Sequence, residues 1–226
     1  MCGRYAIHTD PKGLEFSFTT KNPLANIRPH WNAAPTQILP VVRFNPETRE
    51  RSLDLLRWGL VPHWAKDLSI GHKLINARAE GIETKASFRQ AFWKRRCLVP
   101  ADLFYEWKRE RARKQPYAVA LKSGRTMALA GLWENWRDPS SGEWVRTFTI
   151  ITTAANPLLA PLHDRMPVIL DEADWPTWLG ETADHRDPLG LLHPYPSDRM
   201  RIWPVSDRVN DVRIDEPCLV EPLTPA

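Results

Sequence analysis

The chain alternates between short apolar runs and polar turns, and three pairs of runs have the spacing of β-hairpins. Their connections are rich in Asn, Asp, Pro, Ser and Gly, which favour tight turns, or in charged residues. We expect hairpins from residues 38–44 with 51–58, 104–109 with 117–122 around a charged tip at 110–114, and 127–136 with 144–153. Residues 2–8, 166–170 and 200–205 predict further strands. The pattern indicates a largely antiparallel sheet.

Helical periodicity is confined to two short segments. Phe88, Phe92 and Trp93 have the spacing of one helix face, and Ser87 would cap that helix. Residues 171–179 begin with acidic side chains and end at Gly180, which is the polarity expected of a helix. No change in composition marks a domain boundary. We therefore expect an α+β fold in which residues 1–226 form a single compact domain of antiparallel sheet with peripheral helices.

Composition narrows the class of protein only slightly. The 226 residues carry a net charge of +4, which is compatible with a nucleic-acid partner. The three cysteines have no spacing typical of a disulfide framework or a zinc site. The start has no signal-peptide pattern, and the longest uncharged run, residues 147–163, is broken by prolines and short of a membrane span. We expect a cytoplasmic protein that needs no metal or cofactor.

Cys2 carries the most distinctive candidate chemistry. Removal of Met1 would leave an N-terminal cysteine, whose thiol and α-amine have ordinary pKa values of about 8.5 and about 8. Both groups would then be partly deprotonated near neutral pH. Such a 1,2-aminothiol condenses with an aldehyde, because the amine forms a Schiff base and the sulfur then closes a thiazolidine ring. Alternatively, a small residue at position 2 serves only translation or packing.

Three other segments carry polar groups suited to such a reaction. In an extended segment Asn76 and Arg78 share a face, where an amide can hold an aldehyde or ring oxygen and a guanidinium can hold a phosphate. Glu106 lies between two aromatic residues, and apolar surroundings raise a carboxyl pKa toward the range of a general acid–base group. His163 is a candidate proton shuttle. Structural roles remain alternatives: a capping Asn beside a solvated Arg, a Glu on the wet side of a strand, and a loop His.

Tryptophan is abundant, with eleven residues in the chain. Those near Gly59, Trp64 among them, are a candidate platform for stacking unpaired bases, which contributes about 1–3 kcal/mol per base. Burial in the core is the alternative, and we expect it for Trp58, Trp133 and Trp203.

Seven motifs together resemble the SRAP family, the SOS response-associated peptidases now regarded as abasic-site processing proteins. They run in the family's order from residue 1 to about residue 210, so the resemblance covers nearly the whole chain. In this sequence they are Met1-Cys2-Gly3-Arg4-Tyr5, Trp31-Asn32-Ala33-Ala34-Pro35-Thr36, Arg57-Trp58-Gly59-Leu60, Ile75-Asn76-Ala77-Arg78-Ala79-Glu80, Arg96-Cys97-Leu98-Val99-Pro100-Ala101, Phe104-Tyr105-Glu106-Trp107 and His163-Asp164-Arg165-Met166-Pro167.

The resemblance implies a compact α+β fold around a distorted antiparallel β-barrel. It also implies a monomer that captures abasic sites covalently in single-stranded DNA, including junctions of single and double strands. Cys2 would be the thiazolidine-forming nucleophile, Asn76 would position the sugar, Glu106 would be the acid–base group beside the α-amine, and His163 would assist ring opening and crosslink reversal. The implied DNA contacts are Arg4, Arg78, Lys85 and Arg165 at phosphates, and Trp64 and Trp107 along the bent strand.

Two other functions remain open. A peptidase or amidase of the N-terminal nucleophile type would use the same cysteine, with its own α-amine as base. A glutamine- or peptide-hydrolysis assay would distinguish it. The third reading is a DNA-binding module in which Cys2 is incidental, so that Cys2→Ser changes no DNA assay.

Overall fold

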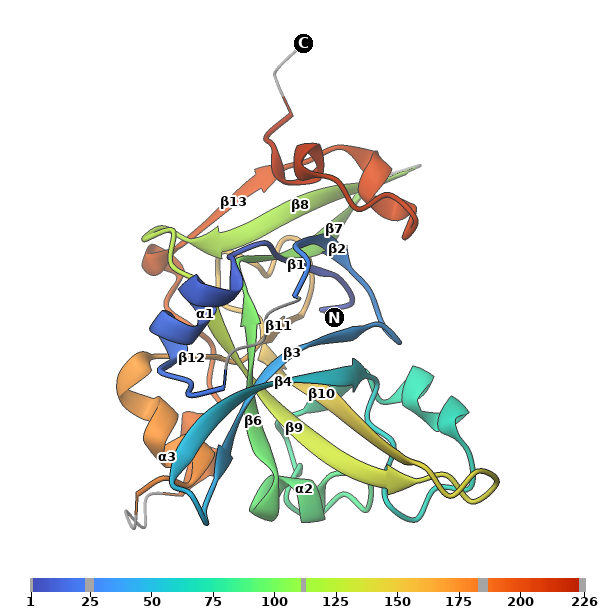
Figure 1. Cartoon of the computed structure of the whole chain (residues 1–226). Coiled ribbons are helices and arrows are strands. Elements are labelled where there is room, and N and C mark those ends of the chain that lie inside the picture. Colours follow the sequence, from blue (N-terminus) through green and yellow to red (C-terminus); the bar gives the residue numbers. More distant parts are fainter. Residues whose placement is uncertain (1, 23–26, 111–112, 183–186, 224–226) are drawn as a thin grey trace.

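Two β-sheets organise the computed structural model, which describes residues 2–22, 27–110, 113–182 and 187–223. The strands in that part of the chain are β1 (Tyr5–Ile7), β2 (His30–Ala33), β3 (Ile38–Asn45), β4 (Glu50–Trp58), β5 (Asn76–Arg78), β6 (Arg96–Ala101), β7 (Leu103–Glu110), β8 (Arg113–Leu121), β9 (Met127–Arg137), β10 (Trp144–Ala154), β11 (Arg165–Pro167), β12 (Ile169–Leu170) and β13 (Met200–Pro204). One sheet has the order β13-β8-β7-β1-β2, and the other has the order β11-β10-β4-β3-β6-β9-β12, with β5 joined to β10. Figure 1 shows the first sheet above the second.

The second sheet closes into a five-stranded barrel, because β10 pairs with both β4 and β9. The ring β3-β4-β10-β9-β6 is antiparallel except at one seam, where β10 runs parallel to β4. β5 continues that parallel pairing along β10. The fold is therefore α+β around a distorted barrel, as expected, but the barrel is mixed. A parallel pair needs a long connection rather than a hairpin, so local sequence patterns do not reveal it.

The predicted hairpins are present. β3 with β4 and β9 with β10 match the expected segments to within one residue at each end. β7 and β8 extend further than predicted into the charged tip, of which residues 111–112 lie outside the described part. The predicted strand 166–170 is divided, since β11 pairs with β10 and β12 pairs with β9. The predicted strand 2–8 is shortened to β1.

Short helices surround the sheets: α1 (Pro11–Phe18), α2 (Arg89–Lys94), α3 (Trp175–Leu179) and the 3-10 helices η1 (Leu68–Lys73), η2 (Glu172–Asp174), η3 (Pro188–Leu191), η4 (Ser197–Arg199), η5 (Asp207–Asn210) and η6 (Pro217–Val220). In the described part of the chain, no helix is long and apolar enough to cross a membrane. The predicted end of a helix at Gly180 is confirmed, because Gly180 caps α3 with a φ of 76°, in the left-handed region that glycine tolerates.

The prediction for α2 is wrong in two respects. Its N-cap is Phe88, without a side-chain hydrogen bond, rather than Ser87. Trp93 is exposed, while Ala91 and Phe92 form the buried face. α1 was not predicted, because its only buried apolar residues are Leu14 and Phe18, too few for a clear period.

The burial of the tryptophans differs in part from the prediction. Trp58 is fully buried between Tyr5 and Phe148, as predicted, whereas Trp133 and Trp203 are only partly buried. The chain turns sharply after Trp58 at Gly59, whose φ is 116°. A Cβ on Gly59 would lie 2.6 Å from the carbonyl oxygen of Gly71. This close approach of two backbone segments holds the loop that leads from the barrel to β5.

Candidate functional site

The beginning of the chain is positioned by β7. Tyr5 pairs with Phe104 in an antiparallel ladder, and the amide of Tyr105 donates to the carbonyl of Arg4 over 3.0 Å. Continuing this register places Gly3 opposite Glu106. Cys2 and Glu106 therefore lie together, and the charge of Glu106 acts on the Cys2 thiol.

Asn76 reaches the same place from β5. The indole of Trp58 donates to the carbonyl of Ile75 over 2.9 Å, and β5 pairs with β10. The Asn76 side-chain nitrogen donates to the carbonyl of Cys2 over 2.8 Å. Its Oδ1 is buried and has no hydrogen-bond partner among the described residues. An unsatisfied buried acceptor beside Cys2 can receive a hydroxyl of a bound sugar.

His163 approaches from the opposite edge of β10, just before β11. Its Nδ1 accepts from the amide of Arg165 over 2.9 Å, and the Asp164 carboxylate lies 2.8 Å from the same nitrogen. One nitrogen cannot accept from the amide and donate to the carboxylate at once. The amide bond assigns the neutral ring a proton on Nε2, which leaves that nitrogen as a donor. When His163 is protonated, its charge acts on Glu106, which indicates that the two side chains lie near each other.

Burial shifts the pKa values of Glu106 and Cys2. Glu106 is 2% exposed, and burial raises the pKa of its carboxyl, while nearby cations, His163 among them, oppose the rise. The alternative of a Glu on the wet side of a strand is therefore excluded. Burial, together with the charge of Glu106, also raises the pKa of the Cys2 thiol well above its ordinary range. This direction applies to Cys2 within a chain that still begins at Met1, so the partly ionised thiol of an N-terminal Cys2 stays a prediction.

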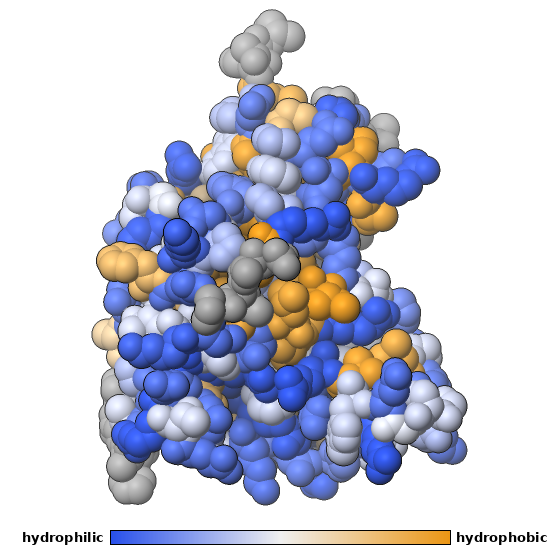
Figure 2. All heavy atoms as spheres, viewed as in Figure 1, coloured by the Kyte–Doolittle hydropathy of each residue, from blue (hydrophilic) through white to orange (hydrophobic). Residues whose placement is uncertain are grey.

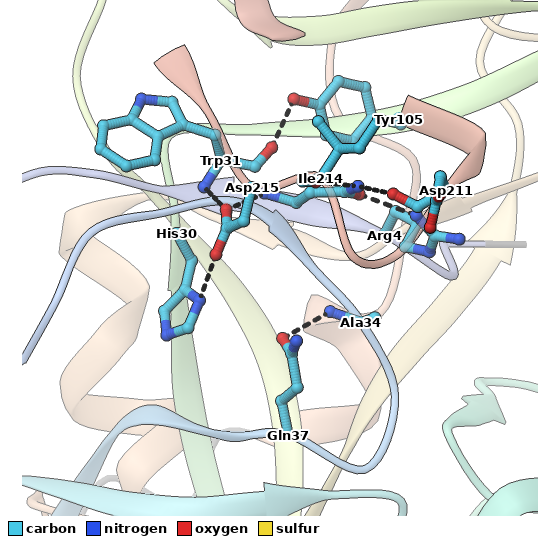
Figure 3. Close-up of polar contacts among 10 residues, drawn as sticks. Arg4, His30, Trp31, Ala34, Gln37, Tyr105, Asp211, Ile214 and Asp215 are labelled. Atoms are coloured by element: carbon cyan, nitrogen blue, oxygen red, sulfur yellow. Dashed lines mark hydrogen bonds and ion pairs between the residues drawn. The ribbon is translucent and has the colours of Figure 1, made fainter. Parts of the chain in front are cut away.

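Arg4 is engaged by the protein itself, as Figure 3 shows. Its guanidinium donates to Asn32 Oδ1 over 2.8 Å. It also donates to the carbonyl of Val209 over 2.7 Å. Asn32 in turn donates to Ile214, and the Asp215 carboxylate accepts from two amides of β2. Arg4 therefore fastens β1 and β2 to the segment around η5, and its contact with a phosphate stays a prediction.

Arg165 is held in a similar way. It is buried and donates to both oxygens of the Glu80 carboxylate, over 2.6 and 2.8 Å, and to the carbonyl of Thr152 over 2.6 Å. Its amide also sets the ring of His163. A DNA phosphate would have to share this guanidinium with Glu80, so the predicted phosphate contact stays untested.

The other predicted DNA contacts lie nearer the surface. Arg78 is exposed and has no ion pair among the described residues, and Lys85 donates to the carbonyl of Glu80 over 2.8 Å. Trp64 is exposed, whereas Trp107 is partly buried and donates to Asn210 over 2.8 Å. The surface is hollowed between the β7–β8 part and the barrel part, and the β1 end of the chain lies beside this hollow (Figures 1 and 2).

The sequence analysis did not identify two residues, Glu80 and Asp215, whose contacts hold other residues in place. Glu80 stands inside the quoted motif that contains Asn76, but nothing local shows that it faces Arg165 across 85 positions. Asp215 lies outside every quoted motif and became visible only as the acceptor at β2. Both contacts join segments far apart in the chain.

Comparisons with known proteins identify the family of this chain. The profile of the family described as SOS response associated peptidase (SRAP) matches residues 1–212. The abasic site processing protein YoqW of Bacillus subtilis is 42% identical over 98% of this chain and 99% of its own. The abasic site processing protein HMCES of Xenopus tropicalis is 30% identical over 96% of this chain and 77% of its own.

A solved structure from Bacteroides thetaiotaomicron has a TM-score of 0.88 at 24% identity, covers 99% of this chain and 100% of its own, and supports the fold alone. The family match includes Cys2 and the three segments that carry Asn76, Glu106 and His163. The chain therefore belongs to the SOS response associated peptidase (SRAP) family.

Proposed function

We propose that the protein processes abasic sites in single-stranded DNA by trapping their open aldehyde as a thiazolidine on Cys2, after Met1 has been removed. Met1 itself lies outside the described residues. One observation carries the proposal: three separate segments bring polar side chains to the Cys2 region. Asn76 donates to the Cys2 carbonyl, the charge of Glu106 acts on the Cys2 thiol, and the charge of His163 acts on Glu106. The names of the relatives, abasic site processing proteins, support the same substrate.

The proposed reaction begins with the sugar. An abasic site is mostly a closed hemiacetal. His163 in its imidazolium form, beside the Asp164 carboxylate, would donate its Nε2 proton to the ring oxygen while the C1′ hydroxyl proton passes to the Glu106 carboxylate. Asn76 Oδ1 would hold a sugar hydroxyl. The α-amine of Cys2 then attacks C1′ of the aldehyde. A proton moves from nitrogen to oxygen, Glu106 in its acid form protonates the resulting hydroxyl, which leaves as water, and a protonated imine remains. Proton transfer of this kind contributes about 10²–10⁴-fold to a rate.

Ring closure completes the trap. The Cys2 sulfur adds to the carbon of the protonated imine, the electron pair of the C=N bond passes to nitrogen, and the thiol proton passes to the Glu106 carboxylate. The sum is one aldehyde and one aminothiol converted to one thiazolidine and one water. Loss of the imine matters, because an imine acidifies the neighbouring carbon and promotes strand cleavage. A thiol whose pKa is raised by burial suits this order, since sulfur attacks only after the amine.

The test uses a single-stranded oligonucleotide whose uracil has been removed by a glycosylase. The protein with a free Cys2 amine, verified by mass spectrometry, should form a denaturant-resistant adduct whose mass equals protein plus DNA minus water. A variant with a residue inserted before Cys2 keeps the thiol but loses the free amine, and should form none. Equal adduct from that variant would overturn the proposal. A peptide-hydrolysis assay on the same preparation tests the N-terminal nucleophile alternative.

A further inference from the structure

A second concave site lies away from Cys2, against α2. It is a pocket of about 470 Å³, which we term the tryptophan pocket, and this size is within the ~300–1,000 Å³ range of small-ligand sites. Its lining includes Trp64, Trp93, Glu83, Arg89, Gln90 and Lys94. Trp64 is 50% exposed and Trp93 is 54% exposed. Two large apolar rings open to water at one pocket are unusual for a surface without a ligand.

The position of Trp93 is defined by its neighbour. The fully buried Phe92 lies with its ring centroid 5.0 Å from that of Trp93, edge to face. The indole is thus supported by the core while its outer part lines the pocket. An aromatic side chain held in this way presents a π-face to a ligand at little entropic cost.

Charge around the pocket favours an anionic ligand. Arg89 and Lys94 are both exposed, and neither has an acidic partner among the residues that the structure describes. Glu83 is the one acidic side chain in the lining, and the Gln90 amide offers both a donor and an acceptor. Aromatic rings among unpaired cations suit the bases and phosphates of a single nucleic-acid strand.

The pocket is joined to the Cys2 site by one short segment. Residues 79–86 begin where the amide of Ala79 donates to Thr152, the residue that also binds Arg165. They end at Ala86 in the pocket wall, and Lys85 donates back to the carbonyl of Glu80. Exposed cations at Arg78 and Lys85 therefore lie between the two sites along the chain.

We infer that the tryptophan pocket receives one unpaired nucleobase of the DNA strand that flanks the abasic nucleotide. The base stacks on Trp93 and Trp64, its edge meets Gln90, and Arg89 and Lys94 hold the adjoining phosphates. The inference rests on the proposed function, because the abasic site at Cys2 determines which stretch of strand can reach the pocket. Since every base has a π-face, recognition here is independent of sequence.

The experiment measures equilibrium binding of oligonucleotides that contain a tetrahydrofuran analogue of the abasic site. The analogue has no C1′ hydroxyl, so it cannot open or crosslink. One series has roughly three nucleotides on each side of the analogue, and two further series extend either the 5′ or the 3′ side to about ten nucleotides. For the wild type, extension on one side should lower the Kd.

Trp93→Ala should weaken binding of that extended oligonucleotide about tenfold and leave the short one unchanged. Trp93→Tyr, which keeps a ring, should retain most of the gain. Trp144→Ala is the matched control, because Trp144 is an even more exposed tryptophan, at 63%, on the β9–β10 hairpin outside the pocket lining. Replacing the flanking bases in turn by abasic spacers should reveal one position where wild type loses the same factor and Trp93→Ala loses nothing more.

Three results would overturn the inference: no gain from extension in the wild type, an unchanged Kd for Trp93→Ala on every oligonucleotide, or an equal loss on the short one. Covalent capture of a short natural abasic oligonucleotide at saturating concentration tests the proposed function separately. Wild-type and Trp93→Ala proteins should react there at equal rates. Failure of capture in both, with the length dependence intact, would reject the thiazolidine proposal and keep the pocket.

Discussion

The site at Cys2 and the tryptophan pocket use side chains in opposite environments. Cys2 and Glu106 are 0% and 2% exposed, and burial changes the protonation of both. Trp64 and Trp93 are about half exposed, and the nearby cations Arg89 and Lys94 are exposed to solvent. Burial strengthens electrostatic effects on reacting groups, whereas exposed ion pairs are weakened by salt. We therefore expect the first region to carry the chemistry and the second to contribute affinity for the strand, and substitutions can separate these two contributions.

The largest effect is expected from Cys2→Ala. The alanine variant keeps a terminal amine, so it should still form an imine that borohydride traps, but the stable adduct should disappear and strand cleavage should increase. Denaturing gels of the labelled oligonucleotide measure both outcomes. Cys218→Ala is the control, because Cys218 is the half-exposed cysteine and it contacts Arg208 beside η5. An undiminished stable adduct in Cys2→Ala would remove sulfur from the mechanism.

Glu106→Gln should reduce the rate of capture by about 10²–10⁴-fold, the usual contribution of a general acid–base group. Glutamine keeps the shape of the side chain but cannot give up or accept the proton. Single-turnover crosslinking under saturating DNA measures the rate, and the Kd for the tetrahydrofuran oligonucleotide should stay within about twofold of wild type. A large change in Kd with an unchanged rate would mean that Glu106 contributes to DNA binding and not to the chemical step.

Arg78→Ala should act on binding alone, with a loss of a few fold. Removal of one phosphate contact should lower the slope of log K against log salt by about 0.7 for a single strand. Titration at several salt concentrations measures that slope. Arg125→Ala, which removes an equally charged side chain paired with Glu172, should leave the slope unchanged. If both variants changed it equally, Arg78 would have no particular place on the DNA path.

The smallest effect concerns stability. Because the fold raises the pKa of Glu106, its neutral form stabilises the protein at low pH, and that contribution is lost as the pH rises through the folded-state pKa. Glu106→Gln carries no charge at any pH. Its Tm should exceed that of wild type by about 2–4 °C above the folded-state pKa. The two values should converge below the ordinary glutamate pKa of about 4.3. A lower Tm for Glu106→Gln at pH 8 would mean that an ionised Glu106 stabilises the fold.

The sequence by itself determined the local elements and the set of candidate residues. Period-two patterns and turn residues identified the β3–β4 and β9–β10 hairpins, because both depend on neighbours in the chain. The ordered motifs also singled out Asn76, Glu106 and His163 beside Cys2. Pairing of neighbouring strands and the order of motifs are properties of the chain, so no coordinates are needed to find them.

Tertiary structure alone decided which groups meet and which are shielded. The parallel seam of β4 with β10, the pairing of Glu80 with Arg165 and the exposure of Trp93 all depend on packing between distant segments. The raised pKa of the Cys2 thiol has the same origin, since a sequence states which atoms are present and not how much water surrounds them. Desolvation and partner geometry arise only when the chain has closed around them, and they determine the reactivity of a thiol and the availability of an arginine.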